Sequence, residues 1–226
     1  MIIAIDGPAG SGKSSVAKII AQKMRFRHIN TGAMYRAVAW KARKLEVDLS
    51  DEPRVAEVAR NQSLQFVPGP ESQTVVADGE DVTALLRSKA VDRDAAIVAS
   101  LGKVREILVA KQRDMGEGGS IVMEGRDIGT VVFPQAERKF FLDATPEERG
   151  KRRYLELQAK NQEVDLDTII EQIRRRDEID RNRKVSPLKP AKDAIYMDTT
   201  NLDLEKVVNQ IMEWIEQAPT QIINRK

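Results

Sequence analysis

The sequence predicts an α/β fold in three layers, with a central parallel five-stranded sheet between two layers of helices. Short apolar runs alternate with segments whose apolar residues recur at helical spacing, which is typical of a parallel sheet flanked by helices. The chain of 226 residues, 41% hydrophobic and 32% charged, is long enough for one such domain with insertions. Every apolar run ends in a polar residue, as expected where open α/β sheets bind their ligands.

The predicted strands are residues 2–6, 27–30, 120–124, 139–143 and 194–198. Because parallel strands end at one edge of a sheet, the polar residues that close them should lie along a common line: Asp6, Asn30, Glu124, Asp143 and Asp198. Between the first two strands, apolar residues at helical spacing predict a helix over residues 16–24.

Two segments interrupt the alternation of strands and helices. Residues 63–67 and 73–77 resemble two strands joined by a Pro-Gly-Pro turn, and Asp78-Gly79 is a hairpin signal, so a small antiparallel sheet is inserted here. Residues 145–184 are helical and strongly basic. Thr145 is a predicted N-cap before Pro and Glu, and a second helix should begin near Asp165 or Asp167.

We therefore expect a single domain over residues 1–226 with three parts. The core is formed by residues 1–60, 104–144 and 185–226, the insertion spans about 61–103, and a basic helical lid spans about 145–184. Residues 217–226 contain a proline and few apolar positions, so we expect that end to fray.

The first motif, G-x-x-x-x-G-K-[ST], lies between the first strand and the first helix. It predicts a P-loop, in which glycines let backbone N–H groups approach a polyphosphate at a helix N-terminus. Lys13 can reach the β- and γ-phosphates and the Ser14 hydroxyl can ligate Mg²⁺. A glycine-rich turn that binds nothing is the alternative, but the flanking strand and helix disfavour it. The predicted nucleotide-binding residues are Gly7, Pro8, Ala9, Gly10, Ser11, Gly12, Lys13, Ser14 and Ser15.

Two further motifs follow predicted strands at the same edge. After the second strand, Thr31 is a candidate N-cap, and Tyr35 and Arg36 lie one turn into the helix, a grouping that suits a phosphomonoester. After the third strand, glycines bracket Arg126 and Asp127, so the arginine could face phosphate while the acid accepts hydrogen bonds. The alternatives are a capped helix with a solvated arginine and a salt bridge in a tight turn.

The lid segment contains more arginine than lysine. On a helix, Arg176, Asp180 and Arg183 share one face, so that the carboxylate would lie between two guanidiniums, and Asp177 and Arg181 form another pair. A solvated, salt-bridged helix is the common explanation for mixed charge, but arginine is well suited to bidentate phosphate contacts. RNA binding is a further alternative, although only 4% of residues are aromatic.

Composition excludes several classes of protein. A formal net charge of +2 excludes a globally basic nucleic-acid binder, and the absence of cysteine excludes disulfides and thiolate metal sites. No apolar run is long enough to cross a membrane and no signal peptide is visible, so we expect a cytoplasmic protein.

Taken together, four blocks of sequence resemble the bacterial-type cytidylate kinases, which are P-loop nucleoside monophosphate kinases. They run in the family's order across nearly the whole chain and are residues 5–15, 30–36, 125–134 and 176–183. The third block and the D-R-N-R sequence of the fourth are the more specific ones. The resemblance implies transfer of a phosphoryl group from ATP to CMP or dCMP, with Mg²⁺ as cofactor, and it implies a monomer without nucleic-acid or membrane partners. In this family the inserted sheet enlarges the monophosphate-binding region.

The resemblance also implies roles for individual residues. The phosphate of CMP would be held by Thr31, Arg36, Arg126 and Arg183, the sugar by Tyr35, Arg176 and Asp180, and cytosine by Arg105 and Asp127. The predicted catalytic residues are Lys13, Arg126 and three lid arginines that would close over the γ-phosphate, Arg152, Arg181 and Arg183. His28, the single histidine, receives no catalytic role.

One position departs from the family pattern. A serine that often contacts cytosine is replaced by Ala96, so Ser100 or another group substitutes, or selection depends more on Arg105 and Asp127. A kinase for UMP or AMP is the nearest alternative function. A GTPase-like switch would need an N-K-x-D motif after an apolar strand, and the sequence has none.

Overall fold

The computed structural model describes residues 1–69, 73–159 and 161–217, and these residues confirm the predicted fold class. A parallel five-stranded sheet with the order β2-β6-β1-β7-β8 forms the centre. Its strands are β1 (Ile2–Asp6), β2 (Arg27–Asn30), β6 (Ile121–Gly125), β7 (Arg138–Asp143) and β8 (Ile195–Asp198). All five lie where the sequence predicts them, with four boundaries shifted by one residue.

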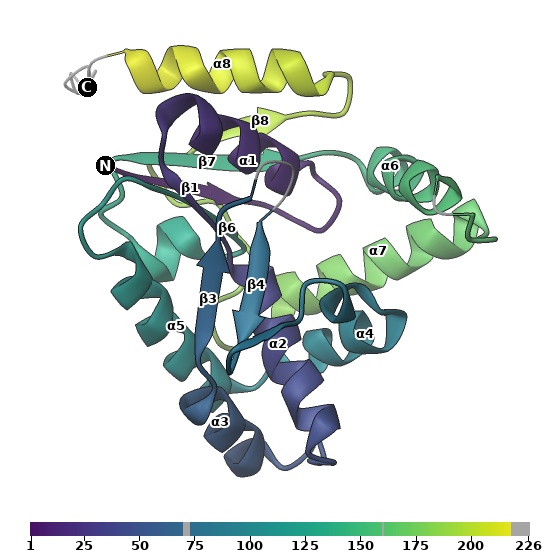
Figure 1. Ribbon diagram of the computed structural model, residues 1–226. Coiled ribbons are helices and arrows are strands. Elements are labelled where there is room, and N and C mark those ends of the chain that lie inside the picture. Colours follow the sequence, from purple (N-terminus) through teal and green to yellow (C-terminus); the bar gives the residue numbers. More distant parts are fainter. Residues whose placement is uncertain (70–72, 160, 218–226) are drawn as a thin grey trace.

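Helices cover both faces of the sheet (Figure 1). On one face α1 (Lys13–Met24) and α8 (Leu204–Glu216) pack against Ile3 and Ile5 of β1. The opposite face is covered by α2 (Thr31–Lys44), α5 (Gly102–Gly116) and a single π-turn, η2 (Ile128–Val132). Strands buried on both sides explain why the central ones read as continuous apolar runs rather than as alternating patterns.

The first helix begins at Lys13, three residues before its predicted start. Gly12 is its N-cap with φ of 87°, so the phosphate loop passes directly into the helix without a side-chain cap. The helix was predicted from the spacing of its apolar residues, and the first of these is Val16. Residues 13–15 form the turn before it and face the cavity rather than the core.

The predicted antiparallel sheet is present and lies between helices of the insertion. It consists of β3 (Leu64–Val67), β4 (Thr74–Ala77) and the short β5 (Glu80–Asp81). Asp78 and Gly79 form the predicted tight turn, with φ of 51° and 81°. Pro70 of the predicted Pro-Gly-Pro turn lies outside the described residues, as do residues 71 and 72. The sheet packs with α2, α3 (Glu52–Asn61), η1 (Leu85–Arg87), α4 (Lys89–Val98) and α5 around one apolar cluster.

Two helices form the lid, α6 (Pro146–Gln158) and α7 (Leu166–Asn182). Thr145 caps the first as predicted, and Asp165 caps the second by accepting a hydrogen bond from the Thr168 amide (2.7 Å). The helices pack closely, because a Cβ at Gly150 would lie 2.4 Å from Ile170. The division into core, insertion and lid remains a prediction.

The C-terminal part of the chain is described as far as residue 217, just after α8. The predicted fraying concerns residues 217–226, nearly all of which lie outside the described residues. In the described part of the chain, no helix combines the length and the apolar content needed to span a bilayer.

Candidate active site

The phosphate loop connects β1 to the first turn of α1. Gly7 must be glycine, because its φ is 146° and a Cβ there would lie 2.0 Å from the Leu142 carbonyl oxygen. Lys13 is buried, and its Nζ donates to the Pro8 carbonyl (2.6 Å) and to Ser11 Oγ (3.2 Å). Burial, followed by the positive charge of Arg126, lowers the pKa of Lys13 well below its usual value of 10.5. The loop therefore presents backbone amides and a buried ammonium to one cavity.

That cavity has a volume of about 1840 Å³ and lies between the phosphate loop, the insertion and the lid. Its lining includes residues 9–15 together with Arg36, Arg152, Arg176 and Asp180. The fold thus brings together predicted site residues from four separate segments. Small-molecule pockets usually measure about 300–1,000 Å³, so this one has room for two nucleotides.

A charged network joins the end of β6 to the lid helix α7. Arg126 Nε donates to Asp180 Oδ2 (3.1 Å), and Arg183 Nη1 lies 3.6 Å from Asp180 Oδ1. Burial would raise the pKa of Asp180, but Arg126, Arg183 and Arg176 outweigh it and hold that pKa below 3.8. The carboxylate lies between two guanidiniums, as predicted, but Arg126 takes the place of Arg176 beside Arg183, and of these two arginines Arg126 makes the hydrogen bond.

A second group is buried deeper and joins α2, α5 and the segment after β6. Arg105 and Asp127 form an ion pair in which both residues are at most 5% exposed. The Arg105 guanidinium lies over the Tyr35 ring, 5.5 Å from its centroid, and burial raises the pKa of Tyr35 to about 12. Tyr35 was predicted to bind the sugar. The structure places it against Arg105, which was predicted to bind cytosine.

Glu124, at the end of β6, faces the first turn of α1. Its carboxylate accepts from Ser14 Oγ (2.7 Å) and lies 3.1 Å from His28 Nε2. Burial would raise its pKa, but these contacts and the charge of Lys13 hold the pKa below 4.5. Sequence reasoning noted Glu124 only as a strand end and missed its place beside the phosphate loop.

The predicted N-cap at Thr31 is wrong. Asn30 caps α2 by accepting a hydrogen bond from the Ala33 amide (3.1 Å), and Thr31 is the first helical residue. The Thr31 hydroxyl instead donates to the Glu124 carbonyl (2.8 Å), which fixes the start of α2 against β6.

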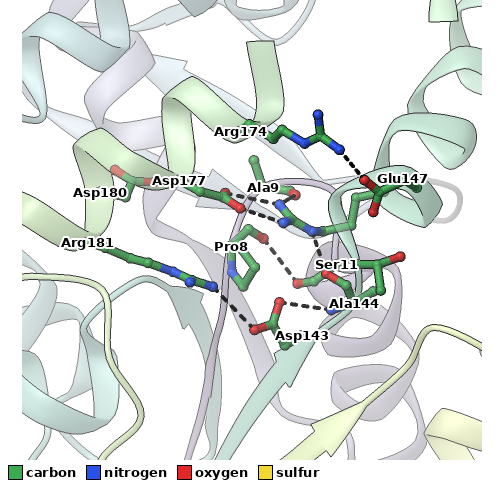
Figure 2. A network of polar contacts seen from close by, with 12 residues as sticks. Pro8, Ala9, Ser11, Asp143, Ala144, Glu147, Arg174, Asp177, Asp180 and Arg181 are labelled. Atoms are coloured by element: carbon green, nitrogen blue, oxygen red, sulfur yellow. Dashed lines mark hydrogen bonds and ion pairs between the residues drawn. The ribbon is translucent and has the colours of Figure 1, made fainter. Parts of the chain in front are cut away.

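Arg149 is the largest omission from the sequence prediction. This α6 residue is 1% exposed, and it donates to Asp177 of α7 (3.0 and 2.5 Å) and to the Ala9 carbonyl of the phosphate loop (3.0 Å). Ala9 and Asp177, which lie near each other in Figure 2, thus both accept hydrogen bonds from this one guanidinium. Its Nε donates to the Ala144 carbonyl (2.8 Å), so one side chain joins both lid helices to the loop.

This contact also shows that the predicted Asp177–Arg181 pair is wrong. Asp177 is taken by Arg149, and Arg181 lies 3.6 Å from Asp143 at the end of β7 (Figure 2). The Arg181 side chain is 55% exposed, and the residue does not line the cavity, so this conformation does not bring it to the other predicted catalytic residues.

The remaining predicted lid residue, Arg152, does face the phosphate loop. It donates to Glu148 and to the Thr199 carbonyl and hydroxyl, and its guanidinium lies 4.0 Å from where a Cβ on Gly12 would be. Ala96 lines the cavity, whereas Ser100 is exposed and its hydroxyl donates to the Ile97 carbonyl. Ser100 therefore does not substitute for the missing serine in this conformation.

Asp6 should titrate close to pH 6. It is buried at the end of β1 and accepts from the Ile128 and Gly129 amides (2.8 and 2.7 Å), but burial outweighs these bonds and raises its pKa from 3.8 to about 6. The folded protein then holds this proton more tightly than the unfolded chain. Its contribution to stability is complete below pH 3.8 and is lost as the pH rises through about 6.

Carboxyl ¹³C shifts followed against pH, with Asp6→Asn to assign the resonance, measure this pKa directly. The prediction fails if the Asp6 resonance titrates at or below 3.8, the value of an unperturbed aspartate.

Comparison with known proteins identifies the family of this chain. The sequence model of the family described as cytidylate kinase matches residues 3–217. The chain is 48% identical to the cytidylate kinase of Bacillus velezensis over 215 residues (95% of this chain, 96% of that protein). It is 47% identical to that of Desulforamulus reducens over 216 residues (96% and 97%). An uncharacterised protein from Eubacterium ventriosum shares the fold at a TM-score of 0.52 and 15% identity, over 96% of this chain and 99% of that one. The chain therefore belongs to the cytidylate kinase family.

Proposed function

We propose that this protein transfers the γ-phosphoryl group of ATP to CMP or dCMP, giving ADP and the corresponding diphosphate. The observation that carries the proposal is the single cavity that has the phosphate loop on one side and Arg36, Arg176 and Asp180 on the other. An ATP on the loop and a nucleoside monophosphate at the arginines would meet within it. Membership of the family supports the same reaction.

The residues divide into three tasks in this proposal. Arg36 and Arg126, with Arg183 and Thr31, hold the monophosphate, Arg176 and Asp180 bind the sugar, and Arg105 and Asp127 read cytosine. Cytosine offers an amino donor beside ring and carbonyl acceptors, to which a carboxylate and a guanidinium are complementary. Arg105 Nε and Arg183 Nη2 are buried and lack a hydrogen-bond partner among the described residues, which supports a ligand at this place.

The chemistry requires positioning more than proton transfer. The acceptor is a phosphate oxygen that is largely ionised near neutral pH, since the second phosphate pKa is about 6. No general base is needed, so Lys13, the loop amides and the lid arginines align the two phosphates and neutralise their charge. We expect the lid and the inserted sheet to close over both nucleotides, because an open site would hydrolyse ATP.

Mg²⁺ fits the oxygen atoms at the start of α1. The Ser14 hydroxyl and the Glu124 carboxylate are 2.7 Å apart, and hard oxygen donors of this kind suit Mg²⁺. Magnesium is commonly held by one or two such groups and by substrate phosphates, so a larger acidic cluster is not required. Ser14 and Glu124 would hold the ion, which would supply positive charge against that of the phosphates.

A coupled assay of ADP release across CMP, dCMP, UMP and AMP tests the proposal. CMP and dCMP should give the highest kcat/KM, and AMP a value lower by ~10² or more, because a purine would leave the buried polar groups at Arg105 and Asp127 unmatched. A reaction without acceptor gives the background of ATP hydrolysis. Equal turnover of all four monophosphates, or a preference for AMP, would contradict the assignment.

We also propose that the enzyme acts as a monomer in the cytoplasm, where its nucleotide substrates are found, and without a nucleic-acid partner. The supporting observation is that residues 9–15, Arg36, Arg152, Arg176 and Asp180 of one chain line the same cavity. Sedimentation equilibrium at assay concentration tests the monomer.

A further inference from the structure

Asp92 lies where the phosphate of the acceptor nucleotide is proposed to bind. It is in the first turn of α4, and one carboxylate oxygen accepts two hydrogen bonds from Arg36, from Nε (3.1 Å) and Nη2 (2.8 Å). The other oxygen lies 3.7 Å from Arg176 Nη1. All three residues line the cavity beside the phosphate loop.

The electrostatics of this contact match those of a bound phosphate group. Burial alone would raise the pKa of Asp92, but Arg36, Arg176 and Arg153 hold it below 3.8, so the group is an anion at neutral pH. Oδ1 of Asp92 accepts from both Nε and Nη2 of Arg36, and these are N–H groups that a phosphate oxygen would also use. Arg36 therefore cannot give the same N–H groups to Asp92 and to a phosphate at once.

We propose that Asp92 is an internal stand-in for the acceptor phosphate, engaging Arg36 and Arg176 until the phosphate of CMP displaces it. Asp92 thereby weakens the apparent affinity for CMP, while it offsets part of the positive charge of Arg36 and Arg176 when the nucleotide is absent. This inference rests on the proposed function, because it assigns the monophosphate to Arg36.

The opposite role would be a carboxylate that orients Arg36 for the phosphate, and the two roles predict opposite changes. The Asp92→Asn variant removes the competing charge and retains the size of the side chain. If Asp92 competes, the Kd for CMP should fall by about two- to fivefold, the range expected for a half-exposed ion pair. If Asp92 orients Arg36, the Kd should rise.

The inhibition constant of cytidine distinguishes an effect on the phosphate site from a general change in the structure. Because cytidine has no phosphate, its inhibition constant should be the same in Asp92→Asn and in the wild type. Calorimetry with CMP and inhibition by cytidine are measured on the same preparations, and Asp92→Glu, which restores the charge, should return the Kd for CMP toward the wild-type value.

Asp78→Asn is the matched control. Asp78 pairs with Lys41 (2.9 Å), and its side chain is about as exposed as that of Asp92. Neither Asp78 nor Lys41 lines the cavity, so the Asp78→Asn variant should bind CMP with the affinity of the wild type. The inference is overturned if Asp92→Asn binds CMP with unchanged or weaker affinity, or if its affinities for CMP and cytidine rise equally. The proposed function remains intact in either case if the wild type phosphorylates CMP. A wild type that does not phosphorylate CMP overturns both.

Discussion

Replacing Lys13 by alanine should lower kcat for CMP phosphorylation by about 10²–10³, the usual cost of removing one preorganised group that stabilises transition-state charge. Lys13 is the buried ammonium of the phosphate loop, and its depressed pKa reflects an environment that is desolvated and faces Arg126. The effect should appear mainly in kcat rather than in KM for CMP, because the CMP-binding residues come from other segments. Steady-state kinetics with both substrates varied would measure it.

Lys23→Ala is the control for this substitution. Lys23 lies in the last turn of the same helix and is exposed, so its removal should leave kcat within twofold of the wild type. Urea unfolding of both variants separates a lost catalytic group from a lost fold. Near-normal CMP phosphorylation by a folded Lys13→Ala protein would show that the phosphate loop does not have the role proposed for it.

The parts of the site that could be predicted from sequence are those in which chemistry is local. The phosphate loop is a continuous motif whose glycines, lysine and serine are set by a strand before it and a helix after it. The strand ends were predictable because apolar runs buried on both faces stop at a polar residue, such as Asp6 or Glu124, although these two remain buried. Gly7 illustrates the limit, since its close contact with the Leu142 carbonyl depends on a neighbouring strand far along the chain.

The ion pairs were less predictable, because sequence spacing identifies only partners on one helix. The chain has 37 basic and 35 acidic residues, so nearly every charge has several candidate partners. Asp177 and Arg181 have suitable i, i+4 spacing, but Asp177 gains more from the fully buried Arg149, 28 positions earlier in the chain. Similarly, Arg176 was predicted to pair with Asp180. In the structure it lies beside Asp92 of the insertion, and Arg126 pairs with Asp180.

Assignment of the N-cap at α2 failed for a related reason. Asn30 and Thr31 are both good capping residues, and the intrinsic preference for Asn over Thr is small. The neighbouring strand decides the matter, because the Glu124 carbonyl accepts the Thr31 hydroxyl and leaves Asn30 to cap the helix. Contacts between segments thus determine which of two equivalent local choices is realised.

Replacing Arg149 by methionine should lower the free energy of unfolding by about 3–5 kcal/mol, the cost of breaking a buried ion pair by removing one partner. Asp177 would remain as a buried carboxylate without its guanidinium, and the Ala9 and Ala144 carbonyls would lose their donors. Because the phosphate loop loses its tie to the lid, KM for ATP should rise as well. Urea unfolding at neutral pH measures the first effect and steady-state kinetics the second.

Two further variants show whether the ion pair itself is responsible. Arg153→Met removes an exposed arginine of the same helix that pairs with Glu156 (3.0 Å), and it should cost no more than about 1 kcal/mol. The double substitution Arg149→Met, Asp177→Leu removes the stranded charge and should regain part of the loss, but not all, since the two backbone carbonyls still lack their donors. If Arg149→Met is no more destabilising than Arg153→Met, the buried guanidinium does not hold the lid to the phosphate loop.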